Sequence, residues 1–116
     1  MPHEFILDYL FPLEPQVKRM FGNHSIYIGP KIYLATRKSE KSPLDDGIWI
    51  GTSVEHHASL KAQFPSIINL RIYKIKKWLL LPVTVADFEE VAIKICELIK
   101  AGDPRIGVLP KPKKKQ

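Results

Sequence analysis

The side chains with the most evident capacity for chemistry are basic and aromatic residues on predicted strands. Lysine and arginine can hold phosphate groups, and aromatic rings can stack on bases. If several share one exposed sheet face, that face could bind a nucleic acid. The alternative, which we favour, is that the rings pack as core while the lysines extend along its rim. The candidate contacts for a nucleic acid or a small ligand are Arg19, Tyr27, Lys31, Tyr33, Trp49, Arg71, Tyr73, Lys74, Lys76, Lys77 and Trp78.

Metal-ligating and nucleophilic side chains are few and scattered. His56 and His57 are adjacent, so on a helix their side chains diverge by about 100° and cannot share a metal ion without other ligands. His3 and His24 lie far away in sequence, and Cys96 is the sole cysteine. Nothing close to Cys96 in sequence would lower the pKa of its thiol. We therefore expect an inert, half-buried thiol and no metal site.

The remaining patterns predict turns rather than a catalytic or cofactor site. Asp45 and Asp46 form a carboxylate pair, but Gly47 follows them, and this run is typical of a turn. The glycines do not have the spacing of a phosphate-binding loop before a helix. We expect a non-enzymatic protein with no catalytic residue, no cofactor and no metal.

Length and charge predict one small domain with a basic end. The chain has 116 residues, of which 45% are hydrophobic, enough for a single modest core. Its formal net charge is +6, and four lysines in residues 111–116 account for most of it, leaving about +2 on the rest. We expect a domain over residues 1–110 and a disordered basic tail over residues 111–116.

The sequence also predicts a cytoplasmic location and no contact with a membrane. No apolar stretch approaches the roughly 18 residues of a membrane span. The first residues lack the basic and then apolar layout of a signal peptide. A single cysteine fits a reducing compartment, because it can form no internal disulfide.

Three segments have the apolar spacing of helices. The first covers residues 3–11 and ends at Pro12. The second follows an apparent capping box formed by Thr52 and Glu55, and it runs to Phe64. The third, with Thr84 expected as its N-cap, runs to Ala101 and is the clearest. Its apolar residues, spaced to form one helix face, are Phe88, Val91, Ala92, Ile95, Leu98 and Ile99.

Six segments are predicted as strands, although two details stay open. The first segment could instead be a short helical turn. The last two could be a hairpin or a single bulged strand, because residues 74–76 contain no turn residue. Between the third and fourth strands, residues 37–47 form a polar loop that we expect to be mobile. The predicted strands are residues 17–21, 25–28, 31–36, 48–51, 67–73 and 76–81.

The turn between the second and third strands decides which residues face each other. A two-residue loop of Gly29 and Pro30 would place Tyr27 opposite Ile32. A three-residue loop that also includes the following lysine would place Tyr27 opposite Tyr33, giving one aliphatic and one tyrosine face. We expect the three-residue loop, because it keeps each face chemically uniform.

Together these elements predict an α+β domain. An antiparallel sheet of about five to six strands would pack against two or three helices, because a sheet of this size needs its apolar face covered.

A short motif resembles a known family. Met20, Phe21 and Gly22 precede an aromatic strand, a glycine turn and the run Lys-Ile-Tyr-Leu-Ala at residues 31–35. With Arg19, Tyr27 and Gly29, they resemble the N-terminal domain of TfoX-type proteins. The later part, with Trp78 leading a strand before the last helix, looks like the related MmcQ/YjbR superfamily. The resemblance implies a small α+β domain and, loosely, a regulatory or DNA-associated role.

Three hypotheses for function remain. The first, which we favour, is a non-enzymatic interaction or regulatory domain that binds a protein partner or itself through a sheet face or edge. The second is a nucleic-acid-binding module that uses the basic and aromatic residues and the lysine-rich tail. The third is a small-molecule or enzymatic site in a pocket lined by Tyr27, Tyr33, Trp49 and Arg19.

Overall fold

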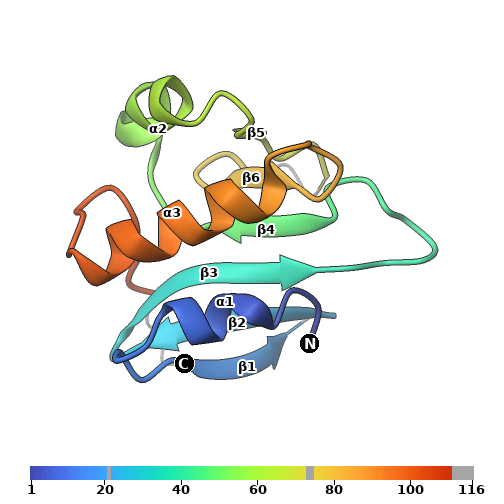
Figure 1. The fold of residues 1–116 in the computed structure, drawn as a ribbon. Helices are drawn as coiled ribbons and strands as arrows, with labels where there is room; N and C mark the ends of the chain where they lie inside the picture. The colour runs from blue at the N-terminus through green and yellow to red at the C-terminus, as the bar shows by residue number, and fades with distance from the viewer. Residues whose placement is uncertain (21, 73–74, 111–116) are drawn as a thin grey trace, which may run out of the picture.

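The computed structural model describes residues 1–20, 22–72 and 75–110, which form a six-stranded antiparallel sheet and three α-helices (Figure 1). The strands lie in the order β1-β2-β3-β4-β6-β5. This is the predicted α+β class. The elements are α1 (Phe5–Tyr9), β1 (Gln16–Met20), β2 (Asn23–Ile28), β3 (Lys31–Arg37), β4 (Gly47–Ile50), a 3₁₀ turn (Val54–His56), α2 (His57–Gln63), β5 (Ile68–Asn69), β6 (Leu79–Pro82) and α3 (Phe88–Lys100).

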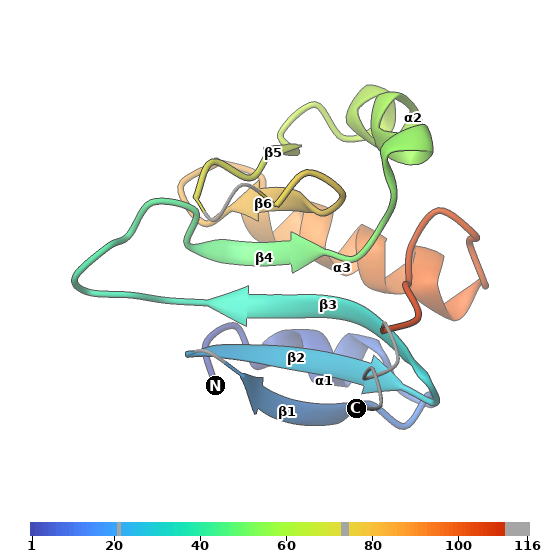
Figure 2. The same cartoon turned by 180° about the vertical axis from the view of Figure 1, so that it is seen from behind.

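The sheet has two chemically different faces. One, which we call the helix face, carries Ile26, Leu34 and Ile50 under α1 and α3 (Figure 1). The other carries Ser25, Ala35, Trp49 and Leu80, and we call it the tryptophan face. Figure 2 shows β1 to β4 in front of α1 and α3.

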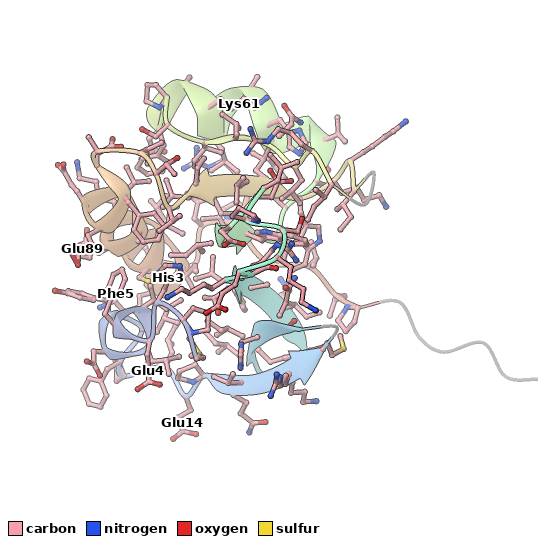
Figure 3. All side chains as sticks on the ribbon, turned by 90° about the vertical axis from the view of Figure 1, so that its right-hand side faces the viewer. His3, Glu4, Phe5, Glu14, Lys61 and Glu89 are labelled. Atoms are coloured by element: carbon pink, nitrogen blue, oxygen red, sulfur yellow. The ribbon has the colours of Figure 1, made fainter. Side chains whose placement is uncertain are left out.

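The N-terminal segment closes the helix face. His3 and Phe5 point between α1 and α3, whereas Glu4, Glu14, Glu89 and Lys61 point outwards (Figure 3). The ring centroids of His3 and Phe5 lie 4.9 Å and 6.4 Å, respectively, from the ring centroid of Phe88. The predicted first helix therefore forms, but with five residues it is shorter than expected.

Helix α3 confirms the clearest sequence prediction, apart from its N-terminal cap. Its buried residues follow the predicted spacing, and Gly102 ends the helix with φ +79°. Thr84 is not the N-cap. The helix begins after Asp87, whose carboxylate accepts a hydrogen bond from Ser66 at 2.6 Å instead of capping its own helix. This bond ties α3 to the chain before β5.

The expected capping box of the second helix is wrong. The Thr52 hydroxyl donates to the carbonyl of Arg105 at 2.6 Å. It therefore binds the chain after α3 instead of capping α2. Ser53 precedes a 3₁₀ turn, and Val54 in this turn is exposed. Leu60 and Phe64 are buried. A carbonyl far away in sequence takes the hydrogen bond of the Thr52 hydroxyl, and the spacing of residues along the chain cannot reveal such a partner.

The predicted register of the β2–β3 hairpin is also wrong. Tyr27 pairs with Ile32 and Ile28 with Lys31, so the loop is the two-residue alternative, Gly29 and Pro30. Ile26 pairs with Leu34, which leaves Tyr33 as an extra residue in a β-bulge. The bulge turns Tyr33 toward the helix-face core while Tyr27 stays on the opposite side. The expected tyrosine face does not form.

The other strands agree with the sequence except at the end of the sheet. Strand β1 forms at Gln16–Met20, and the last predicted residue of that strand, Phe21, lies outside the described residues. Only Ile68–Asn69 of the predicted fifth strand is a strand, and β6 begins at Leu79 rather than Lys76. Strand β5 pairs antiparallel with β6, so the two form a hairpin with a long connection rather than one bulged strand.

A glycine at the start of β4 permits the close approach of β6. Gly47 has φ +142°, and a Cβ built on it would lie 2.2 Å from the carbonyl oxygen of Leu81. Gly29 also has a positive φ, +59°, but no described atom lies within 4 Å of a Cβ there. A side chain at Gly47 is therefore excluded by a steric collision as well as by the backbone conformation, whereas at Gly29 only the backbone conformation disfavours one.

We predict that Gly47→Ala lowers the free energy of unfolding by about 3 kcal/mol or more, because strain and a backbone collision add together. Gly29→Ala, the matched control, should cost about 1 kcal/mol from its positive φ alone. Urea denaturation of both variants measures the difference. Equal losses would show that β4 and β6 do not approach as closely as described.

Candidate binding pocket on the tryptophan face

Small side chains make a hollow in the tryptophan face. One cross-strand row runs from Lys18 through Ser25, Ala35 and Trp49 to Leu80. Residues paired in this way lie on the same face of the sheet. Ser25 and Ala35 are much smaller than their neighbours, so the floor is low between β1 and Trp49.

The hollow is a largely apolar pocket of about 530 Å³. Strands β1 to β4 provide its floor and one side, and residues after β5 provide the opposite wall. Its volume lies within the range of small-molecule sites. The described residues that line it are Met20, Asn23, Ser25, Ile32, Ala35, Trp49, Ile75 and Trp78.

The two tryptophans are held in place by different means. The Trp49 indole Nε1 donates to the carbonyl of Asp45 at 2.9 Å, and only 5% of the residue is exposed. Trp78 lies over Gly51, where a Cβ would be 3.4 Å from the ring atom Cη2 and 2.9 Å from the carbonyl oxygen of Ile32. The glycine at position 51 is therefore required by the close approach of the β3 backbone, whereas a Cβ there would make an ordinary contact with the Trp78 ring.

A buried carboxylate fixes the segment that bears Trp78. Asp45 is 1% exposed and has φ +66°, a conformation that Asp tolerates better than most residues. Its carboxylate accepts the backbone N–H groups of Arg71 and Ile72 at 2.5 and 2.9 Å and the Arg71 Nε at 2.8 Å. These bonds anchor the start of residues 70–78 beside β4.

The same bonds determine the protonation of Asp45. Burial alone would raise the pKa of this carboxyl group. The backbone N–H groups of Ile72 and Arg71 and the Arg71 guanidinium outweigh that effect and lower its pKa. Asp45 is thus a charged structural anchor whose hydrogen-bonding capacity is used within the fold.

Asp46 bonds to different partners from those of Asp45. Its oxygens accept the backbone N–H of Ser39 at 2.9 and 3.1 Å, and one lies 3.4 Å from the Nε of buried Arg37. Arg37 also donates to the carbonyl of Ser42 at 2.9 Å. The sequence correctly predicted turn chemistry at this position, but not how extensively the turn is bonded to its surroundings.

The far end of the 70–78 segment is bound to α2. The His57 ring Nε2 lies 2.7 Å from the carbonyl oxygen of Lys77, within hydrogen-bonding distance. Lys61 also donates to the side chain of Asn69, at the start of this region. His57 is thus a half-buried residue that holds the residue before Trp78.

The tyrosine and arginine side chains that were predicted to line the pocket together do not lie together in the structure. Tyr33 packs against the helix-face core, so close to Gly107 that a Cβ there would lie 2.7 Å from the ring. Arg19 pairs with His24 and therefore faces away from the row of Ser25. Lys18 Nζ lies 4.6 Å from the Tyr27 ring centroid in a cation–π contact. Of the residues predicted to form the pocket, Trp49 is in its described lining.

The remaining basic candidates are dispersed. Lys31, Lys76 and Lys77 are exposed, and Arg71 is bonded to Asp45. Lys74 and Tyr73 lie outside the described residues. Sequence reasoning missed the small floor residues, and a signal for them existed: Ser25 and Ala35 interrupt strands otherwise rich in large residues. It also missed Asn23, which precedes the predicted second strand at residues 25–28 but begins β2 and lines the pocket.

Within residues 1–20, 22–72 and 75–110, no cluster of three or more His, Cys, Asp or Glu side chains could hold a metal ion. In the same ranges no helix is long and apolar enough to cross a membrane. Cys96 is fully buried rather than half-buried, and burial raises the pKa of its thiol to about 12. The thiol therefore stays protonated, as expected for an inert core residue.

Comparison with protein-family models gives no match to this chain, and searches of curated proteins and of solved structures find no significant similarity. The resemblance to the TfoX N-terminal domain and to the MmcQ/YjbR superfamily therefore stays a prediction. The function must be argued from the pocket and its surroundings.

We predict that Asp45→Asn lowers the free energy of unfolding by about 2–4 kcal/mol, because an amide cannot accept all three donors and carries no charge for Arg71. Asp8→Asn, at an exposed position of α1, is the control and should change the free energy of unfolding by less than about 0.5 kcal/mol. Because the folded-state pKa of Asp45 is lowered, its contribution is present above about pH 4 and is lost as the pH falls further. Denaturation from pH 7 to pH 2 should therefore bring the wild type and Asp45→Asn together; a constant gap would contradict this.

Proposed function

We propose that this protein is a non-enzymatic, cytoplasmic binding domain with an interaction or regulatory role, and that it binds through the pocket of the tryptophan face. The observation that carries the proposal is the hollow between Trp49 and Trp78, floored by Ser25 and Ala35. A sheet face packed only for stability would fill such a space. Here a buried carboxylate, Asp45, bonds Arg71 and Ile72 beside the sheet instead of letting a large side chain fill the hollow.

The chemistry of the lining supports binding rather than catalysis. The described lining residues are apolar except Asn23 and Ser25, and none of these residues titrates near neutral pH. The Ser25 hydroxyl would need a neighbouring base to act as a nucleophile. The histidine next to it in sequence, His24, faces the other side of the sheet because side chains alternate along a strand.

The arrangement of aromatic rings favours the pocket over a nucleic-acid surface. Base stacking needs ring faces open to solvent. Trp49 is buried, Tyr33 packs on the helix face, and Lys18 covers a face of Tyr27. Exposed lysines can still contact phosphates, so nucleic-acid binding remains the alternative prediction. A mobility shift at low salt, with and without residues 111–116, tests it.

Self-association through the edge of the sheet is less favourable than ligand binding. Strand β1 is an exposed edge, with all five of its residues exposed. Two copies pairing antiparallel about its centre would place Lys18 opposite Lys18, and like charges directly opposite are destabilising. The single buried cysteine, Cys96, fits the reducing compartment that we propose. A regulatory role is also what the resemblance to TfoX-type proteins implies.

We predict that the neutral fluorescent probe N-phenyl-1-naphthylamine binds the folded protein and that Ala35→Leu weakens this binding at least about tenfold, because the larger side chain fills the pocket floor. Ala58→Leu, at an exposed position of α2, is the matched control and should bind the probe like the wild type. A fluorescence titration gives the affinities, and circular dichroism verifies that each variant is folded. A folded Ala35→Leu variant with unchanged affinity would contradict the proposed binding surface.

A further inference from the structure

The charged residues that accompany the pocket lining in sequence all carry the same sign. Met20, Ile32, Ile75 and Trp78 line the pocket, and each has a lysine or an arginine directly beside it in sequence. No aspartate or glutamate lies within two positions of any described lining residue. Fixed charges of one sign around an apolar hollow raise the local concentration of oppositely charged molecules. The pocket is therefore set in surroundings that attract anions.

The carboxylates lie elsewhere in the fold. The helices that cover the opposite face of the sheet bear several of them, and the carboxylates of the turn before β4, Asp45 and Asp46, are bonded to Arg71 and Arg37. The sheet thus separates a basic side from a more acidic one. The acidic residues of α1 and α3 are Asp8, Glu89, Glu90 and Glu97.

Lys18 is the cation that the strand pairing places beside the pocket. It pairs with Ser25, a floor residue, and therefore lies on the tryptophan face. Its ammonium lies 4.6 Å from the centroid of the Tyr27 ring. Tyr27 is two positions from Ser25 on β2 and pairs with Ile32, and both of these neighbours line the pocket. The ammonium is therefore at the rim of the pocket, on the side of β1.

The ammonium of Lys18 is available to a ligand. Strand β1 is exposed along its whole length, and within residues 1–20, 22–72 and 75–110 no carboxylate forms an ion pair with Lys18. A cation–π contact at an exposed site is weak, and an ammonium has three donors. An anion can therefore pair with Lys18 without breaking an existing ion pair.

We propose that the pocket binds a small amphiphilic anion, whose apolar body lies between Trp49 and Trp78 and whose anionic group lies at the rim and pairs with Lys18. This inference rests on the proposed function, because it names the ligand class of the same pocket. No described lining residue is charged, so the anionic group stays outside the apolar interior, where water still solvates it. An aromatic or aliphatic carboxylate has this chemistry.

Two probes of nearly equal shape test the ligand class. 2-Naphthylacetate is an anion at pH 7, and 2-naphthylacetamide replaces its carboxylate with an uncharged amide. Ligand-observed NMR titrations at low salt should show the carboxylate binding the wild-type protein about threefold to fivefold more tightly, as expected for an exposed ion pair. Salt at about 0.5 M should bring the two affinities together, because it screens that pair. Equal affinities at low salt, or tighter binding of the amide, would overturn the proposal.

A charge reversal at the rim gives the second arm. In Lys18→Glu the order of the two probes should reverse, because the carboxylate now meets a like charge. Lys100→Glu changes the net charge equally, but it lies at an exposed position of α3 on the other face of the sheet. This control should keep the wild-type preference, and circular dichroism verifies that both variants are folded.

Two results with these variants would count against the assignment of Lys18. The first is a carboxylate preference that persists in folded Lys18→Glu. The second is an equal loss of preference in Lys100→Glu, which would show that the preference comes from the net charge of the whole chain. The wild-type comparison of probes needs no variant, so a folding failure of Lys18→Glu leaves the proposal testable.

The outcomes also separate this inference from the proposed function. If N-phenyl-1-naphthylamine binds the wild type and is lost in Ala35→Leu while the carboxylate and its amide bind equally, the pocket binds ligands but the ligand class is wrong. If Ala35→Leu binds every probe like the wild type, both proposals fail.

Discussion

The buried carboxylate of Asp45 connects the two chain segments on which the tryptophan face depends. It sits in the turn before β4, and it accepts both backbone and side-chain donors from residues 71 and 72. Its own carbonyl accepts the indole N–H of Trp49. One residue therefore orients a tryptophan of the sheet and anchors the segment that carries the other tryptophan. Because a buried charge without partners is very unfavourable, the loss of these bonds would be strongly destabilising.

The two faces of the sheet solve different physical problems. The helix face buries large aliphatic residues under α1 and α3, and this core provides the hydrophobic stabilisation of the domain. The tryptophan face has a smaller cluster at one end, formed by Trp49, Leu70 and Leu80 with Ala35 at its border. Next to Trp49 the cross-strand row carries the small side chains of Ala35 and Ser25. A domain with its core on one face can leave the other open for binding, because stability and ligand recognition then rest on different residues.

The sequence predicted the fold class and α3 well, because a long amphipathic repeat leaves one reasonable structure. It failed where a distant partner changed the local outcome. Residues 67–73 alternate like a strand, but the N–H groups of Arg71 and Ile72 bond to Asp45 instead of a neighbouring strand. Thr52 has the spacing of a cap, yet a carbonyl 53 residues away accepts its hydroxyl. Tyr33 occupies a bulge, so a pairing chosen for uniform faces was wrong. Of the candidate site, the sequence identified Trp49 and Trp78, but the position of Lys18 beside the pocket depends on strand pairing and becomes visible only in three dimensions.

Methyl NMR during a titration with N-phenyl-1-naphthylamine tests the central claim most directly, because it locates the ligand on one face of the sheet. We predict shift changes and intermolecular nuclear Overhauser effects at Ile32, Ile75 and Ala35, which line the pocket. We predict none at Ile95 and Ile99, which lie in the helix-face core. Effects centred on the helix-face methyl groups, or no effect at saturating ligand, would contradict the proposed binding surface.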